Sequence, residues 1–430
     1  MTPKVFNLKE TKYDIDDLVD KVTSARPDYS GVISQVKEIV EDVRRRGDAA
    51  VLEYVSKLDN VELSIDDIRV SREELREAYL KLDRRVRKSL ENLAENIRIH
   101  SRKLLRRLKL SYSYKGVQVN LSPVAIESVG CYIPGGAAAY PTTALMTVIP
   151  AKTAGVERIV AASPLYEKTK STPVLAALHI AGVHEVYRIG GPHAVAALAY
   201  GTGLIKPVKK IIGPGGAYVT AAKLLVSNQV AVDMPAGPTE LVVMCDETAD
   251  ARDVVLELCA QAEHSRDTMV GVVTTSPELA ESILEGMKVE AVKKQRSDMI
   301  RYSWEMNGFV IVCSNMNDAA EIVNKIAPEH VAVFTKRPNK VASLVKNAGL
   351  ISVGYYSSPV LCDYIVGVNH VLPTGGAAKI RGGLSILDYV HLKQEVKISK
   401  GASKALSKKA YPLALAEELT AHAEALERLR

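Results

Sequence analysis

Residues 129–163 have the sequence VGCYIPGGAAAYPTTALMTVIPAKTAGVERIVAAS. A short apolar run leads into Gly135 and Gly136, a helix-forming stretch follows at 144–156, and an apolar run rich in small and β-branched residues returns at 157–163. A strand, a glycine turn, a helix and a second strand are the parts from which parallel sheets are built. The segment therefore predicts a parallel sheet with a glycine-rich turn at one edge.

The same alternation continues along most of the chain from about Val117. Strand-like runs that are apolar on both faces, separated by helical runs, predict a parallel sheet covered by helices. Because the alternation begins again after Pro238, we expect an α/β protein of two similar, incomplete Rossmann-like units. The further strands expected are 184–190, 209–215 and 230–237 in the first unit, and 239–247, 268–276, 308–315, 330–336 and 350–357 in the second.

The two ends of the chain differ from this pattern. Residues 71–110 combine apolar residues at helical spacing with dense charge, and the tail from about Gly401 is also helical in character. The basic stretch raises the possibility of a nucleic-acid surface, but the net charge is only +6 and the 430 residues include 18 Tyr, 3 Phe and 1 Trp. A solvated amphipathic helix explains the charge better, and we expect no nucleic-acid partner.

Cysteine usage and hydropathy indicate the compartment. The five cysteines are odd in number, far apart and without a CxxC pair, which is typical of reduced thiols in the cytoplasm. The N-terminal residues are charged where a secretory signal would be apolar, and no apolar run approaches the ~18 residues of a spanning helix. We expect a cytoplasmic protein without a membrane partner.

Two glycine-rich turns are candidates for a phosphate site. One contains Gly135 and Gly136, and the other contains Gly213, Gly215 and Gly216. Such turns bring backbone N–H groups at a helix N-terminus close to a phosphate. Neither turn has the GxGxxG or GxxxxGK[ST] spacing, so each alone is equally compatible with a structural turn. Two turns in one α/β unit favour a dinucleotide crevice.

Three clusters combine histidine with a carboxylate or carboxamide. They are QAEH at 261–264, PEH at 328–330, and the stretch from Asp363 to His370. A carboxylate beside an imidazole suits general base catalysis, and oxygen donors with imidazoles suit zinc. Each cluster alone is compatible with surface or capping groups. Because all three belong to the second unit, we expect them to converge, and His422 in the tail is a further candidate.

Taken together, these motifs resemble the histidinol dehydrogenase family. The resemblance covers nearly the whole chain, and its strongest segments are 129–156, 233–240, 261–264, 327–330, 367–376 and 417–422. It implies an NAD-dependent, four-electron oxidation of L-histidinol to L-histidine through an aldehyde held on the enzyme, in the final steps of histidine biosynthesis. It also implies one zinc ion per site.

The resemblance implies roles for individual residues. The zinc ligands would be Gln261, His264, Asp363 and, from the tail of a neighbouring subunit, His422. Glu329 and His330 would be the catalytic acid–base pair, with His330 taking the proton and Glu329 activating water. The positions that match substrate contacts are Thr239, Gln261, His264, His330, Asp363, His370, Glu417 and His422.

Three positions match the cofactor-contacting residues of the family. Tyr132 is retained, whereas the family's Gln is His193 here and its Asn is Gly216. The resemblance therefore implies an NAD site in which two of three side chains are changed. Near the expected metal ligand Asp363, the family's glycine is replaced by Cys362.

The resemblance also implies a division of the chain. Residues 1–34 would be an N-terminal helical segment, and 35–125 with 237–375 would form the larger α/β domain that carries the catalytic motifs. Residues 126–236 would be an inserted α/β domain on the NAD side, and 376–430 a C-terminal dimerising tail. The expected assembly is a homodimer in which each tail completes the partner's site.

Two other functions remain open at this point. The changed NAD positions are compatible with a paralogous zinc- and NAD-dependent alcohol dehydrogenase that acts on another small alcohol, such as a sulfonated diol. A non-catalytic binding protein with a basic helical face is the third possibility. The presence of Glu417, His370 and all four ligand positions favours histidinol.

Overall fold

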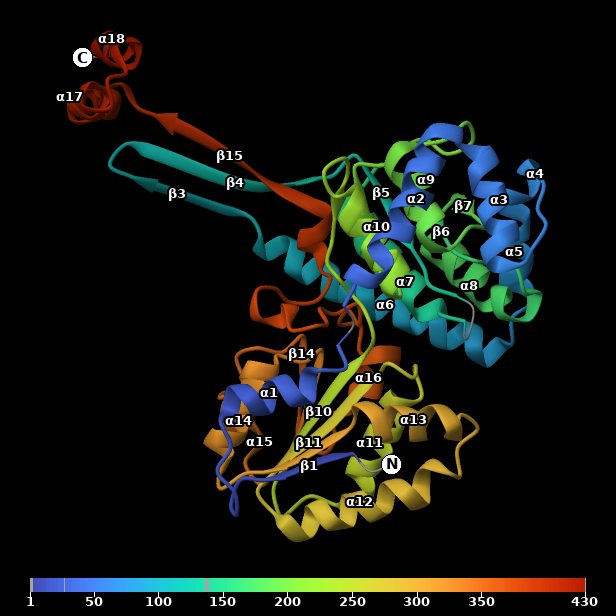
Figure 1. The fold of residues 1–430 in the computed structure, drawn as a ribbon. Coiled ribbons are helices and arrows are strands. Elements are labelled where there is room, and N and C mark those ends of the chain that lie inside the picture. The colour runs from blue at the N-terminus through green and yellow to red at the C-terminus, as the bar shows by residue number, and fades with distance from the viewer. Residues whose placement is uncertain (1–2, 27, 136–138, 430) are drawn as a thin grey trace.

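The computed structural model describes residues 3–26, 28–135 and 139–429, so Gly136 of the first glycine turn lies outside them. The strands of this part of the chain form two six-stranded sheets and a three-stranded sheet (Figure 1). Strands β5 to β9 of one large sheet lie in the sequence between β1 and β10 of the other. The expected fold of two parallel α/β units, one inserted in the other, is confirmed. We call the two large sheets the outer sheet and the inserted sheet.

The outer sheet is parallel throughout, in the order β1-β12-β11-β10-β13-β14. Every residue of its four central strands is buried, which explains why these runs are apolar on both faces. Its strands are β1 (Lys4–Asn7), β10 (Glu240–Cys245), β11 (Met269–Thr274), β12 (Phe309–Val312), β13 (His330–Phe334) and β14 (Leu350–Val353). Its helices are α1 (Ile15–Thr23), α11 (Ala251–Ala262), α12 (Pro277–Ala291), α13 (Ser297–Asn307), α14 (Met316–Ile326), α15 (Pro338–Ala342) and α16 (Pro359–Tyr364).

The inserted sheet has the order β2-β7-β6-β5-β8-β9 and is parallel except for β2. Helix α7 begins with Pro141, a favourable first helical residue, and ends at Gly155 in the left-handed conformation. The strands are β2 (Arg69–Val70), β5 (Ser128–Tyr132), β6 (Arg158–Ala162), β7 (Glu185–Tyr187), β8 (Lys210–Ile212) and β9 (Ala231–Val232). The helices between them are α7 (Pro141–Ala154), α8 (Lys168–Ala181), α9 (Gly191–Tyr200) and α10 (Ala217–Val226).

The helices that precede the inserted sheet pack on that sheet, which differs from the expected grouping of 35–125 with 237–375. Val36 and Val40 belong to the core around β6 and α9, and Leu93 and Ile97 belong to the core around β5 and α7. An amphipathic pattern marks a buried stripe but does not say which sheet it covers. These helices are α2 (Ser30–Arg46), α3 (Asp48–Asp59), α4 (Ile65–Ile68), α5 (Arg72–Lys81) and α6 (Arg84–Arg107).

The first residues do join the outer unit. Strand β1, which the helical expectation for 1–34 missed, pairs with β12, and Leu18 and Val22 of α1 are in the core with β10 and α14. The chain therefore passes from the outer to the inserted unit between α1 and α2 and returns after β9.

A long arm projects from the two units and carries the C-terminus (Figure 1). Its antiparallel strands are β3 (Leu110–Tyr114), β4 (Val117–Ala125) and β15 (Val390–Ile398), and α17 (Lys400–Ala416) and α18 (Thr420–Glu427) lie at its tip. All of β3 and all but the first residue of β15 are exposed. Two short 3-10 turns, Ala377–Lys379 and Ile386–Tyr389, lead into β15.

The packing of β11 against β12 in the outer sheet can be tested by substituting Gly271. A Cβ at this position in β11 would lie 2.1 Å from Cζ of the buried Phe309 ring. Gly271→Ala should destabilise the protein by about 1–3 kcal/mol through overpacking. In α2, Gly31 has nothing within 4 Å of an added Cβ, so Gly31→Ala should instead raise stability by up to ~1 kcal/mol. Urea unfolding followed by circular dichroism measures both; equal stability of the two variants would contradict this packing.

Candidate active site

The candidate site lies where the carboxyl edge of the inserted sheet faces the amino edge of the outer sheet. Thr143, in the first turn of α7 after β5, has its Oγ1 3.0 Å from Nε2 of His370. Asn369 Nδ2 also donates to the Met146 carbonyl of α7 at 2.8 Å. The loops around the two sheets are thus bonded directly to each other.

Glu329 and His330 lie at the amino end of β13, at the centre of this junction. They are 7% and 3% exposed. Glu329 Oε2 accepts from the backbone N of Glu240 at 3.0 Å, and Oε1 is 3.9 Å from His330 Nε2. His330 Nδ1 is buried without a hydrogen-bond partner in the described part of the chain. A buried orphan nitrogen is costly, so a ligand is the natural partner for it.

Burial sets the ionisation of this pair. Burial, together with the smaller effects of the neighbouring His370 and His264, lowers the pKa of His330 to about 3. Burial also raises the pKa of Glu329 well above its ordinary value, although the hydrogen bond from Glu240 N works in the opposite direction. Near neutral pH His330 is therefore a neutral imidazole that can accept a proton.

Two of the residues expected to bind a metal, Gln261 and Asp363, are in direct contact. Gln261, 1% exposed at the end of α11, donates from Nε2 to Oδ2 of Asp363 in α16 at 3.3 Å. The carbonyl of Asp363 lies 2.9 Å from Nδ1 of His370. Burial raises the pKa of Asp363 to about 7 and lowers the pKa of His264. Neutral imidazole, amide oxygen and carboxylate are donors that zinc accepts.

The tail residues are not part of this cluster. Glu417 and His422 are exposed and line a hollow of about 330 Å³ between α17 and α18, at the far end of the arm (Figure 1). Within the described residues no group of three or more His, Cys, Asp or Glu can hold a metal. One chain therefore bonds Gln261 to Asp363 but does not bring His422 to them.

The expected cofactor positions lie along the carboxyl edge of the inserted sheet. Tyr132 ends β5, is 4% exposed, and its hydroxyl accepts from Gly191 N at 3.1 Å. His193, in the first turn of α9, is fully buried; both ring nitrogens lack hydrogen-bond partners among the described residues. Its Nε2 is 3.7 Å from Asp59 Oδ2, and burial lowers its pKa to about 4. Gly216 is the N-cap of α10.

Sequence reasoning missed a buried charge that supports the catalytic pair. Arg26 donates to both carboxylate oxygens of Glu240, from Nε at 2.9 Å and from Nη2 at 3.0 Å. Glu240 also accepts from Gly375 N at 3.0 Å, and its own N–H holds Glu329. Glu240 ends the DMPAGPTE segment, which was a usable signal, whereas no pattern in the sequence singles out Arg26. Thr239, directly before β10, is half-buried.

Two parallel α/β units that meet over a buried carboxylate–imidazole pair define a protein of the two-unit α/β class with one candidate acid–base site. The family model described as histidinol dehydrogenase matches residues 23–429. The chain belongs to the histidinol dehydrogenase family.

Individual relatives cover almost the entire chain. A histidinol dehydrogenase of Methanothermobacter thermautotrophicus is 40% identical over 98% of this chain and 99% of its own length. One of Agrobacterium fabrum is 39% identical over 94% of each chain. A crystal structure of histidinol dehydrogenase from Elizabethkingia anophelis matches with a TM-score of 0.92 and 29% identity, covering 99% of this chain and 98% of that one. These matches do not favour a paralogue with another alcohol substrate or a non-catalytic binding protein.

The raised pKa of Glu329 has a consequence for stability. A carboxyl whose pKa is higher in the folded protein binds its proton more tightly there, so its stabilising contribution is lost as pH rises through the folded pKa. In protein treated with a chelator, Glu329→Gln should therefore gain thermal stability over the unsubstituted chain as pH rises from 5 to 8. Glu281→Gln, exposed on α12, should show no such trend. Parallel pH profiles of melting temperature for all three proteins would refute this assignment.

Proposed function

We propose that this chain oxidises L-histidinol to L-histidine in two NAD-dependent steps, with the intermediate aldehyde held between the two sheets. The observation that carries the proposal is the buried Glu329–His330 pair beside the Gln261–Asp363 contact. The Glu329–His330 pair can transfer protons, and the residues of the Gln261–Asp363 contact can hold a substrate in the same junction. The family membership supports the choice of histidinol as that substrate.

His330 is the proton acceptor in the proposed reaction. Alcohol oxidation requires removal of the hydroxyl proton as hydride leaves the same carbon, and a neutral imidazole does this. Burial keeps His330 neutral, and its partnerless Nδ1 is free to accept. His370, held between Thr143 Oγ1 and the Asp363 carbonyl, is placed to contact the substrate beside it.

Glu329 serves the second oxidation, which requires water to add to the aldehyde. One carboxyl oxygen is fixed by Glu240 N, and the other faces His330. A carboxyl anchored at one oxygen can orient a water molecule with the other. The Arg26–Glu240 ion pair holds the backbone that supplies this anchor.

Zinc fits the donor set near His330. Gln261 uses its amide nitrogen on Asp363, so its carboxamide oxygen is the atom available to a metal, and His264 is neutral. Gln261, His264 and Asp363 would hold the ion together with His422 of the partner subunit. Zinc there supplies a positively charged anchor for the substrate's imidazole and amine. Neutralising Asp363 would remove the only carboxylate of this set.

A swapped tail accounts for exposed apolar residues in two places, on and after α16 and at the tip of the arm. Leu361, Tyr364 and Val366, around Asp363, are 47%, 61% and 49% exposed. On the tail, Leu413 and Leu419 beside Glu417 are 66% and 42% exposed. Exposed apolar clusters of this kind are typical of protein–protein contacts. In a homodimer each tail would cover the partner's α16 and bring Glu417 and His422 to the substrate.

NAD is the proposed cofactor, at the carboxyl edge of the inserted sheet. Bound there, it takes up the hydride released from the substrate carbon. Tyr132 and the N-terminus of α10 at Gly216 line this edge, and the partnerless nitrogens of His193 lie beside it. A helix N-terminus favours the negative charge of a pyrophosphate, and a pyrophosphate contact through backbone N–H groups does not need the family's Asn side chain.

The compartment proposed is the cytoplasm. All five cysteines are free thiols; four are buried and Cys362 is half-buried. Free thiols are typical of a reducing compartment. Among the residues described, none of the helices is both long and apolar enough to pass through a membrane.

The stoichiometry of the reaction tests the proposed function. The protein mixed with limiting L-histidinol and excess NAD should release two NADH per histidinol, measured by absorbance, and a chelator should abolish the activity until zinc is restored. His330→Asn should lower kcat by about 10²–10⁴-fold, the usual contribution of a general base. Absence of NADH with every metal supplied would refute the proposal.

Complementation tests the swapped tail. His422→Ala and Glu329→Gln chains, each inactive alone, should regain activity when unfolded together and refolded as a mixture. Random pairing makes half of the dimers heterodimers with one intact site of two, so about a quarter of the unsubstituted activity is expected. Two chains with His422→Ala and His330→Asn should give the same recovery. No recovery in purified heterodimers would mean that each site is built from one chain.

A further inference from the structure

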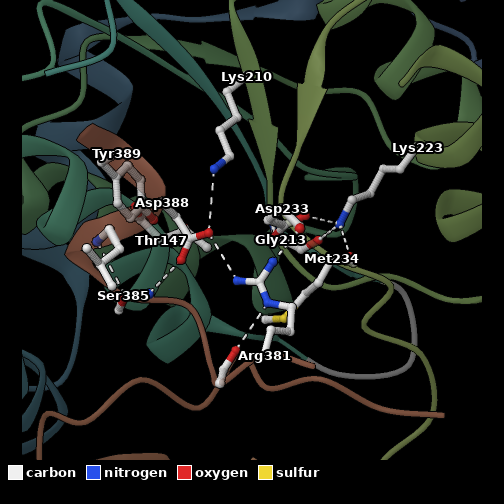
Figure 2. Close-up of polar contacts among 12 residues, drawn as sticks. Thr147, Lys210, Gly213, Lys223, Asp233, Met234, Arg381, Ser385, Asp388 and Tyr389 are labelled. Carbon is white, nitrogen blue, oxygen red and sulfur yellow. Dashed lines mark hydrogen bonds and ion pairs between the residues drawn. The ribbon is translucent and has the colours of Figure 1, made fainter. Parts of the chain in front are cut away.

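A buried ion pair lies beneath the glycine turn that follows β8 (Figure 2). Lys223, in the last turn of α10, pairs with Asp233, which follows β9; their side chains are 3% and 0% exposed. Removing two charges from water is costly, and such a pair persists only where further hydrogen bonds satisfy both groups. The backbone groups that form these further hydrogen bonds are therefore the groups that the ion pair holds in place.

The pair binds both backbone groups of Gly213. Gly213 N donates to Asp233 Oδ2 at 2.8 Å, and the Gly213 carbonyl accepts from Lys223 Nζ at 2.9 Å. Lys223 Nζ also donates to the carbonyl of Met234 at 2.8 Å. Figure 2 shows Lys223 and Asp233 beside Gly213, with Met234 next to them. Gly213 follows the last residue of β8, so side chains and not strand pairing hold its backbone in place.

Gly213 lies between two of the residues proposed to contact NAD. Its φ is +126°, and an added Cβ would lie 2.0 Å from the carbonyl oxygen of Tyr132, so only glycine is accommodated. Three residues later Gly216 begins α10. The turn of residues 213–216 has no side chain that could lock its conformation apart from the ring of Pro214. The Lys223–Asp233 ion pair restrains the turn through its bonds to Gly213.

We propose that Lys223 and Asp233 are positioning residues for the cofactor, which fix the turn of residues 213–216 so that its backbone N–H groups bind the pyrophosphate of NAD. This inference rests on the proposed function. It assigns a role to two charged residues that touch neither the acid–base pair nor the metal cluster. It also explains how the NAD edge keeps its shape where Gly216 replaces a side chain that contacts the cofactor in the family.

The rest of the cluster provides a control. Arg381 donates to the Asp233 carbonyl and to Asp388 Oδ1, the second at 3.0 Å. Lys210 Nζ is 3.5 Å from the same Asp388 oxygen. Lys210 therefore belongs to the same charged cluster and is 14% exposed, but it does not bind the glycine turn. A role in NAD binding predicts different effects for Lys223 and Lys210, whereas a purely structural role predicts similar ones.

The test compares NAD binding by full-length variants. In Lys223→Met/Asp233→Asn both charges are removed together, so neither is left buried alone, and replacing a whole ion pair is commonly tolerated. We expect its Kd for NAD, measured by calorimetry without histidinol, to rise at least about tenfold, because displaced binding groups cost that much or more. The KM for histidinol should change by no more than about twofold, since the acid–base junction is untouched. Lys210→Met should bind NAD as the unsubstituted chain does.

The outcomes are distinct. A folded double variant whose NAD affinity equals that of the unsubstituted chain would overturn the inference, as would an equal loss in Lys210→Met. If the double variant does not fold, Lys223→Arg decides: it keeps the charge pair, but its planar head cannot reproduce both carbonyl contacts, so NAD affinity should still fall while histidinol KM stays constant. Unchanged NAD affinity of the Lys223→Arg variant would also overturn the inference. If the unsubstituted chain itself binds no NAD, the proposed function fails, and not this inference alone.

Discussion

The contact between the two sheet edges is the constraint on which the rest of the site depends. Thr143 at the start of α7 bonds His370, and His370 in turn bonds the backbone of Asp363. One short chain of hydrogen bonds therefore links the inserted sheet, where glycine turns and helix N-termini gather, to His370 and Asp363 of the outer unit. Hydride transfer needs its two partners within contact distance, and this junction is where the fold can provide that.

Burial is the common cause of the unusual ionisation in the site. It lowers the pKa of His370 to about 4 and that of His330 to about 3, while it raises the pKa of Asp363 to about 7. The site therefore carries little charge of its own. A divalent cation would lower the pKa of Asp363 again, because a nearby positive charge favours the ionised carboxylate. In the proposed reaction, a substrate with an imidazole and an amine would therefore meet a site whose charge depends on the proposed zinc ion.

The sequence predicted the strands of both large sheets except β1 and β2, because runs such as VVMC in β10 and VIV in β12 are buried on both faces and form continuous apolar segments. It did not predict the arm. β3 and β15 are exposed, and β15 pairs with β4, whose residues lie more than 250 positions earlier, so neither burial nor local sequence marks them. The sequence also did not predict the packing of α2 to α6 on the inserted sheet. An amphipathic pattern indicates which face of a helix is buried but not which sheet covers that face.

For the site, local clusters and the family resemblance proposed groups that are distant in the sequence, and the structure brings two of them, Gln261 and Asp363, together across about 100 residues of sequence. The supports of these groups were not predictable. Arg26 and Lys223 are isolated basic residues in the sequence, and only their burial beside Glu240 and Asp233 reveals what they do. Charges of this kind follow from the fold, because their partners are distant in the chain.

A crystal structure of the protein with zinc, NAD and a histidinol analogue that cannot react would show whether the two sheet edges form one site. We expect the nicotinamide ring between Thr143 and His330, about 3–3.5 Å from the reacting carbon. We also expect anomalous scattering from zinc among Gln261, His264, Asp363 and His422 of the partner subunit. A nicotinamide bound away from the junction of the two sheets, or a metal site completed by the same chain, would contradict this arrangement.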